Sequence, residues 1–280
     1  MRIWLAQGDE TGRLVDGAQA RVSVFDHGFT VADGVFETLK VSDGVVFALR
    51  RHLDRLGRSA VAMGLPAPDP EAVAAAVHET ASANAPLIGA LGRLRVTYTA
   101  GEAPLGSDRG EAGPTLVVAV SPMKPWPESA AVITVPWPRN ERSPLAGVKS
   151  TSYAENVIAL SRAHEHGAGE ALMADTRGML CEGTGSNVFV VLDGRPITPS
   201  LATGCLPGIT RELVLEWSSA EEQDLPFEVL SEAEEVFITS STRDVQPVHR
   251  VDARTLIAPG PVTTAVRNEF DRRSRADSDP

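Results

Sequence analysis

Pro144-Leu-Ala-Gly-Val-Lys149-Ser-Thr-Ser-Tyr153-Ala-Glu-Asn156 is the most informative segment of the chain, and a second one, Cys181-Glu182-Gly-Thr-Gly-Ser-Asn187-Val-Phe189, follows it. Lys149 is an unusual residue, because Lys40 and Lys124 are the only other lysines in a chain whose basic charge is carried by arginine. A small apolar turn precedes Lys149 and a polar segment follows it, so its amine is expected to face a cavity. Partial burial lowers the pKa of an amine and favours the neutral form that attacks carbonyl groups. The stretch therefore indicates a Schiff-base lysine.

Two more motifs accompany this lysine. They are His52-Leu-Asp-Arg55-Leu56, within a helical pattern, and Leu206-Pro-Gly-Ile-Thr210-Arg211, at the start of another. Together with Lys149 and the Cys181 to Phe189 motif they resemble the class IV, fold-type IV pyridoxal-phosphate enzymes. That family includes branched-chain aminotransferases, D-amino-acid aminotransferases and 4-amino-4-deoxychorismate lyases. The resemblance spans nearly the whole chain. It implies an α+β protein with a small N-terminal α/β domain and a larger, β-rich C-terminal domain.

The resemblance also implies a cofactor, pyridoxal 5'-phosphate, and the residues that bind it. Lys149 is expected to hold the cofactor and to move protons on and off the substrate. Glu182 is expected beside the pyridine nitrogen, where a carboxylate stabilises the ring proton and keeps the ring electron-poor.

The phosphate of the cofactor is expected to bind four residues from three separate motifs. Arg55 can donate two parallel hydrogen bonds to a phosphate, which an ammonium group cannot reproduce. Ile209 and Thr210 open a helix whose first amides bind anions well, and the Thr210 hydroxyl adds a donor. Ser241 follows a predicted strand and is the second hydroxyl that the resemblance assigns to the phosphate.

Four residues are candidates for the substrate pocket. Phe36 occupies the aromatic position of an N-terminal hairpin whose inner residues otherwise alternate as packing residues. Arg95 and Arg109 are candidate carboxylate holders, although Arg95 could equally pair across a sheet, and Arg109 lies in a long polar loop of the kind that carries binding residues. Tyr153 follows the lysine as a tyrosine does in branched-chain aminotransferases.

The reaction that these motifs favour is that of a 4-amino-4-deoxychorismate lyase, which gives 4-aminobenzoate and pyruvate for folate synthesis. Leu145-Ala-Gly-Val-Lys149 resembles the approach to the lysine in those lyases. Tyr153 and Arg95 instead resemble residues of branched-chain aminotransferases. The alternative is therefore an aminotransferase that acts on branched-chain or D-amino acids with a 2-oxo acid acceptor, although the D-amino-acid enzymes carry a tyrosine where Phe36 stands. A non-catalytic binding protein on the same fold is a third possibility, which the retention of Lys149, Glu182 and Arg55 disfavours. The family implies a homodimer.

Composition excludes several classes of protein. The net charge of −11 argues against binding to nucleic acid or to an acidic membrane, and no apolar run reaches the length that spans a bilayer. Two cysteines in different motifs and the absence of a signal-peptide core indicate a reduced, cytoplasmic protein. His164 and His166 are expected on different helix faces, so no metal site is predicted.

The chain is expected to divide into a first domain at residues 1–121, a proline-rich connector at 122–128 and a cofactor-binding domain at 129–280. A hairpin is predicted from Phe36 to Leu49, and an amphipathic helix from Leu49 to Met63. The last four residues, from Asp277 on, are expected to be mobile.

Overall fold

The computed structural model describes residues 1–280, which form two compact units. The first unit contains residues 1–125, 148–152 and 278–280, and the second contains 126–147 and 153–277. The fold mixes helices with large sheets, as the sequence predicts. No helix is long and apolar enough to cross a membrane.

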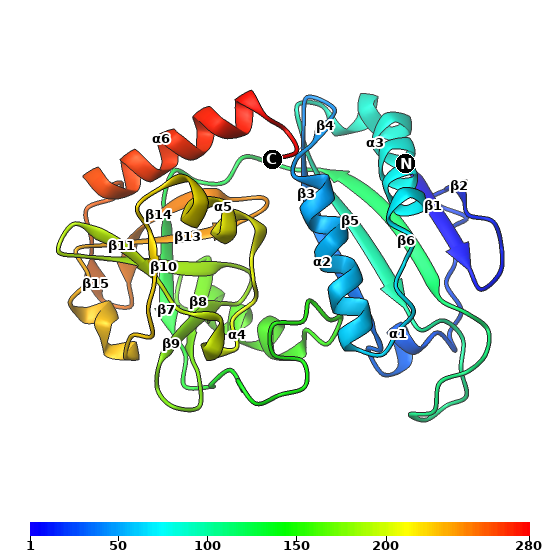
Figure 1. Cartoon of the computed structure of the whole chain (residues 1–280), viewed down its shortest axis with the longest axis horizontal. Coiled ribbons are helices and arrows are strands. Elements are labelled where there is room, and N and C mark those ends of the chain that lie inside the picture. The colour runs from blue at the N-terminus through cyan, green and yellow to red at the C-terminus, as the bar shows by residue number, and fades with distance from the viewer. The chain divides into compact units, whose positions relative to one another are not determined.

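The first unit is built on one antiparallel sheet of six strands in the order β2-β1-β6-β5-β3-β4. Its strands and helices are β1 (Arg2–Gln7), β2 (Arg13–Asp16), α1 (His27–Thr30), β3 (Gly34–Ser42), β4 (Val45–Val46), α2 (Leu49–Ala62), α3 (Pro70–Ile88), β5 (Leu91–Thr99) and β6 (Thr115–Pro122). In Figure 1 these strands run side by side with α2 and α3 over them.

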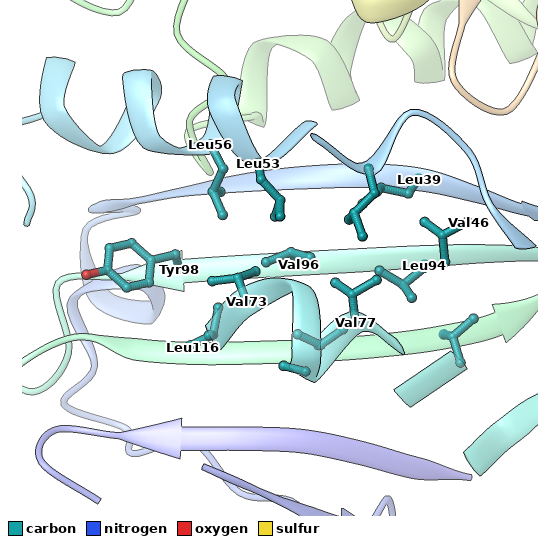
Figure 2. Packing of buried hydrophobic residues seen from close by; sticks show 14 of the residues in the cluster. Leu39, Val46, Leu53, Leu56, Val73, Val77, Leu94, Val96, Tyr98 and Leu116 are labelled. Atoms are coloured by element: carbon teal, nitrogen blue, oxygen red, sulfur yellow. The ribbon is translucent and has the colours of Figure 1, made fainter. Parts of the chain in front are cut away.

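Alternation along β3 decides which of its side chains reach the core. Val35, Leu39 and Val41 are fully buried against α2 and α3. Figure 2 shows Leu53 and Leu56 of α2 pointing into the same layer. Because successive side chains of a strand point to opposite faces, the even-numbered residues of β3 lie on the other face of the sheet.

The predicted hairpin and amphipathic helix are both present. β3 pairs with the short β4, and α2 follows directly and ends one residue before the predicted end. Helix α2 presents Leu49, Leu53 and Leu56 to the core at three- and four-residue spacing, which is why its period was readable from the sequence.

The second unit contains a sheet in the order β12-β11-β10-β13-β14-β7-β8-β9, with β15 paired to β14. Its elements are β7 (Ala130–Thr134), α4 (Ala154–Glu165), β8 (Glu170–Ala174), β9 (Leu180–Gly183), β10 (Asn187–Leu192), β11 (Arg195–Thr198), η1 (Leu201–Thr203), α5 (Ile209–Trp217), β12 (Glu221–Glu222), η2 (Phe227–Ser231), β13 (Glu235–Ser240), β14 (Asp244–Val251), β15 (Arg254–Thr255) and α6 (Pro261–Ala276).

Contacts between aromatic side chains and between small side chains stabilise the second unit. Phe189 of β10 and Phe237 of β13 are opposite each other in the register, and their rings stack with centroids 4.7 Å apart. Ala159 and Ala163 of α4 pack on Met173 of β8, so small residues bring that helix close to the sheet. Trp217 at the end of α5 contacts Phe270 of α6.

The units are divided differently from the predicted ranges in two places. Residues 148–152, which carry Lys149, belong to the first unit because they pair with β3, although the predicted second domain included them. Residues 278–280 also belong to the first unit. The prediction that this tail is mobile is wrong, because the Ala48 amide donates to the Ser278 carbonyl at 2.7 Å. Asp279 accepts from the Arg50 amide at 2.9 Å and so caps the first turn of α2.

Candidate functional site

In the first unit Lys149 lies on the edge of the sheet beside β3. The Phe36 amide donates to the Lys149 carbonyl at 2.9 Å, and the Thr151 amide donates to the Gly34 carbonyl at 2.8 Å. This pairing brings Lys149 next to Phe36, on the face of the sheet opposite the apolar core. Its Nζ lies 4.4 Å from the centroid of the Phe36 ring, and the side chain is half-buried.

Arg95 reaches the same ring from β5. Its guanidinium carbon lies 3.7 Å from the Phe36 centroid, and its Nε donates to the Thr97 hydroxyl at 3.1 Å. Phe36 and Thr97 are partners in the β3-β5 register, which accounts for the approach of Arg95 from two residues away. The structure therefore brings two predicted residues, Lys149 and Arg95, to the ring of a third, Phe36.

Arg55, the predicted phosphate residue, takes part in a buried cluster with Glu37 and His52. Its Nε and Nη2 donate to the two carboxylate oxygens of Glu37 at 2.8 and 2.7 Å, and His52 Nδ1 lies 2.6 Å from Glu37 Oε2. Burial by itself would raise the pKa of Glu37, but Arg55 and His52 together lower it to about 2. Burial lowers the pKa of His52, against the opposing effect of Glu37. The cluster thus holds an ionised carboxylate in an apolar layer.

In the second unit Glu182 on β9 is buried, and both of its oxygens have partners. Oε2 accepts from the Leu206 amide at 2.9 Å, and Oε1 lies 3.1 Å from Arg139 Nε. The geometry of the Arg139 contact is that of an ion pair rather than an aligned hydrogen bond, because Nε has no hydrogen-bond partner. Arg139 Nη1 also donates to Asn156 at 3.3 Å.

Asn187 ties the Glu182 motif to the turn before α5. Its side-chain amide donates to the Leu206 carbonyl at 2.8 Å, so Leu206 is held from both sides, by Glu182 at its amide and by Asn187 at its carbonyl. Gly208 is required in this turn because a Cβ atom there would lie 2.0 Å from the Asn187 amide oxygen. Two motifs that are well separated in the sequence therefore form one rigid loop pair.

Helix α5 begins in this loop pair and leaves its first amides without a side-chain cap. Gly208 is the N-cap residue and provides no side-chain hydrogen bond to the first turn. Ile209 and Thr210 are the first two residues of the helix, and both are buried. Arg211 fixes the helix from behind through hydrogen bonds to the Pro199 carbonyl and to Glu222. An uncapped helix N-terminus with a threonine in its first turn can bind an anion.

Ser241 lies in the tight turn between β13 and β14 and is half-buried. The turn is held by Arg243, whose guanidinium stacks on Trp126 at 3.7 Å and lies 3.5 Å from Glu170. Glu170 also accepts from the amide of Thr184, in the loop after the Glu182 motif. The buried carboxylate of Glu170 therefore contacts both Arg243 in the Ser241 turn and Thr184 in the second loop.

The structure gives two predicted substrate residues other surroundings. Tyr153 is half-buried at the N-cap position of α4, in the second unit. Arg109 makes a two-pronged ion pair with Asp33 at 2.7 Å and donates to the Met63 and Gly64 carbonyls at the end of α2. These contacts anchor its long loop to the rest of the unit, and Arg109 is left out of the substrate site proposed below.

Sequence reasoning missed two residues of these clusters. The chain contains many arginines, and nothing in the type of residue distinguishes Arg139 from the others. Its only signal in the sequence is its position in the segment that precedes Lys149. Glu37 was interpreted as one of the alternating packing residues of β3. A better signal existed, because a carboxylate on the apolar side of a strand needs a buried partner, and His52 and Arg55 are one helical turn apart on the inner face of α2.

Comparison with known proteins places the chain in a family. The model of amino-transferase class IV matches residues 34–251. The chain belongs to the class IV aminotransferases. It is 36% identical over 282 residues to a Methanocaldococcus jannaschii protein provisionally named a branched-chain-amino-acid aminotransferase, covering 96% of this chain and 95% of that one. It is 32% identical to a D-alanine aminotransferase of Bacillus licheniformis, covering 92% and 95%.

Solved structures agree with this assignment. The branched-chain aminotransferase of Thermoproteus uzoniensis, solved with norvaline, has a TM-score of 0.88 and 30% identity over 97% of this chain and 94% of that one. A Legionella pneumophila protein provisionally named a 4-amino-4-deoxychorismate lyase has a TM-score of 0.85 at 24% identity, over 92% and 97%, and shares the fold. The chain is therefore an enzyme of fold type IV that depends on pyridoxal phosphate.

The side chains present fit that cofactor. In the first unit, Arg55 is a cation of the kind that binds a phosphate. In the second unit, taken by itself, the uncapped start of α5 provides the amide donors that an anion needs. A protonated pyridine nitrogen needs an ionised carboxylate, which Glu182 provides beside Arg139. An aldehyde needs an amine on a half-buried lysine, which is Lys149.

Proposed function

We propose that the protein is an aminotransferase that moves the amino group of a branched-chain or similar apolar amino acid to a 2-oxo acid with a second carboxylate. The relatives that are at least 30% identical support this reaction, since their names describe aminotransferases. Phe36 also favours it over D-amino-acid transamination, because the D-amino-acid enzymes place a tyrosine at that position.

The observation that carries the proposal is the arrangement of Arg95 and Lys149 around the Phe36 ring. Arg95 Cζ lies 3.7 Å and Lys149 Nζ lies 4.4 Å from the centroid of the Phe36 ring. The distance between the guanidinium and the amine therefore cannot exceed the sum of these two distances. The second carboxylate of a short 2-oxo diacid, bound to Arg95, would thus hold the acceptor within reach of Lys149. The Phe36 ring is buried and positions both cationic groups.

Pyridoxal phosphate, when bound, supplies an aldehyde that captures the substrate amine and a ring that accepts electrons from the substrate α-carbon. Lys149 holds the cofactor and then accepts and returns the α-carbon proton through its Nζ atom. Glu182, with Arg139 at 3.1 Å, would stabilise a proton on the ring nitrogen.

The remaining residues hold the phosphate and fix the position of the ring. Arg55 donates from its guanidinium, and Ile209, Thr210 and Ser241 donate from their amides or hydroxyls. An anchored phosphate prevents the ring from drifting while protons are transferred, which preserves the geometry on which the rate depends. Tyr153 is kept as a substrate residue on the family resemblance alone.

A second copy of the chain is proposed to complete the enzyme as a homodimer. Val24, Phe25 and Phe29 are 66%, 49% and 76% exposed, and Leu105 is 75% exposed. The two loops that carry them are adjacent, because the Ala103 amide donates to the Phe25 carbonyl at 3.2 Å. An apolar patch of this kind is typical of a protein interface. Sedimentation should give a dimer, and Phe29→Glu should give a monomer; a monomeric wild-type protein would contradict this.

Lyase activity on 4-amino-4-deoxychorismate is the second candidate, and one sequence feature favours it. Leu145-Ala-Gly-Val-Lys149 resembles the approach to the lysine in the lyases. The same cofactor residues would serve in both reactions, so the distinction lies in whether a 2-oxo acid acceptor is required.

The test is a product assay with the purified, cofactor-loaded protein. L-leucine with 2-oxoglutarate should give glutamate over many turnovers, whereas D-alanine with 2-oxoglutarate should react far more slowly. Arg95→Met should raise KM for 2-oxoglutarate about 10- to 100-fold through the loss of a charged hydrogen bond, and leave KM for pyruvate nearly unchanged. Equal increases for both acceptors, or release of 4-aminobenzoate and pyruvate from aminodeoxychorismate as the faster reaction, would contradict the proposal.

A further inference from the structure

Glu37 is a carboxylate in a place where packing alone calls for an apolar side chain. It is fully buried on β3, in the row formed by Val35 and Leu39, and it faces α2. Replacing a buried ion pair with well-packed apolar residues is often neutral or stabilising. Fold stability therefore does not account for the choice of a charged residue here, and a functional reason is needed.

The contacts of Glu37 show what it controls. Two parallel hydrogen bonds, 2.8 and 2.7 Å long, join its oxygens to Nε and Nη2 of Arg55. A two-pronged contact of this kind fixes the plane of the guanidinium as well as its position. The Nε and Nη2 edge of Arg55 is therefore held by β3 in one fixed orientation.

His52 fixes the carboxylate itself. Its Nδ1 lies 2.6 Å from Glu37 Oε2, and an ionised carboxylate can only accept, so Nδ1 must carry the hydrogen. His52 is fully buried one helical turn before Arg55. The rigid unit therefore has three members, in which α2 supplies both the histidine and the arginine and β3 supplies the carboxylate between them.

We propose that Glu37 is a positioning residue for the cofactor phosphate: it fixes the plane and the position in which the Arg55 guanidinium meets the anion. This inference rests on the role of Arg55 in the proposed function. It assigns no direct contact to Glu37. The expected consequence is selective, because a mispositioned Arg55 weakens the grip on a phosphate and leaves the binding of the ring unchanged.

The test is a comparison of two ligands, pyridoxal phosphate and pyridoxal, bound to the cofactor-free protein. Glu37→Gln keeps the shape of the side chain and removes its charge. It should weaken the affinity for pyridoxal phosphate about 10- to 100-fold, in line with the effect of residues that orient a ligand-binding side chain, and change that for pyridoxal less than about twofold. Glu235→Gln is the matched control, since Glu235 is a buried carboxylate that accepts from the first amides of α6 in the second unit. It should change neither affinity.

A double-mutant cycle with Arg55→Met then decides whether Glu37 acts through Arg55. If it does, Glu37→Gln has no further effect on pyridoxal phosphate binding in the Arg55→Met protein. The proposal is overturned if Glu37→Gln binds pyridoxal phosphate as the wild type does, if it weakens both ligands equally, or if its effect persists without Arg55. Should Glu37→Gln fail to fold, Glu37→Asp keeps the charge but shortens the reach, and the same selective loss is expected.

Failure of this inference is distinguishable from failure of the proposed function. Unchanged phosphate affinity in Arg55→Met alone would remove Arg55 from the phosphate site, and the inference with it. The identity of the reaction is decided separately, by the products formed from leucine and 2-oxoglutarate.

Discussion

Replacement of Arg55 with methionine should destabilise the cofactor-free protein strongly and change how its stability depends on pH. Arg55 is the chief partner that keeps the fully buried Glu37 ionised, with a pKa of about 2 against a usual value of 4.5. At 1.36 kcal/mol per pKa unit this difference corresponds to about 3 kcal/mol, and removal of one partner of a buried pair costs about 3–5 kcal/mol. We therefore expect Arg55→Met to lose about 3 kcal/mol at pH 7, measured by urea unfolding.

The sign of the pH effect provides a second check. Because the folded pKa of Glu37 lies below the unfolded value, its contribution is present above pH 4.5 and is lost as pH falls toward 2. Between pH 7 and pH 3 the wild type should lose about 2 kcal/mol from this group. Arg55→Met should lose less, since its Glu37 takes up a proton at higher pH. The double variant Glu37→Leu with Arg55→Met should recover most of the stability. A loss below about 1 kcal/mol in Arg55→Met at pH 7, or parallel pH curves, would refute the reasoning.

Three further predictions concern other parts of the chain. Gly208→Ala should displace Asn187, because its Cβ would lie 2.0 Å from the amide oxygen, and should weaken cofactor binding about tenfold in an absorbance titration; unchanged affinity would contradict the tight turn. Asp279→Ala should remove the cap on the first turn of α2 and lower the unfolding free energy by about 1 kcal/mol, whereas a mobile tail would give no change. Cys181 and Cys205 should react with a thiol reagent only after unfolding, because burial raises the pKa of both thiols, that of Cys205 to about 11; fast labelling of the folded protein would show that they are accessible.

Local pattern predicted the elements of the first unit well. The alternation of Val35, Leu39 and Val41 and the spacing of Leu53 and Leu56 both follow from burial of one face, which sequence records directly. The same pattern could not show that Glu37 shares that face as a charged residue, because a period gives the direction of a side chain and not its partner.

Tertiary pairing accounts for what could not be predicted. Residues 148–152 join the first unit through hydrogen bonds to β3, over a separation in the chain that no local rule covers. Likewise, nothing in the spacing of the motifs indicates that Glu182 and Asn187 hold the same residue, Leu206, from two sides. The motifs named the candidate residues, and the structure supplied the contacts that each of them makes.

The most direct test of the central claim is the amount of 2-oxo acid released when the cofactor-loaded enzyme receives an amino donor alone. An aminotransferase without an acceptor must stop after each active site has taken one amino group. We predict one equivalent of 4-methyl-2-oxopentanoate per subunit from L-leucine, and continued turnover only after 2-oxoglutarate is added. The Lys149→Ala protein should release none. Sustained formation of pyruvate from aminodeoxychorismate without any 2-oxo acid, and no product from L-leucine, would contradict the claim and identify the enzyme as a lyase.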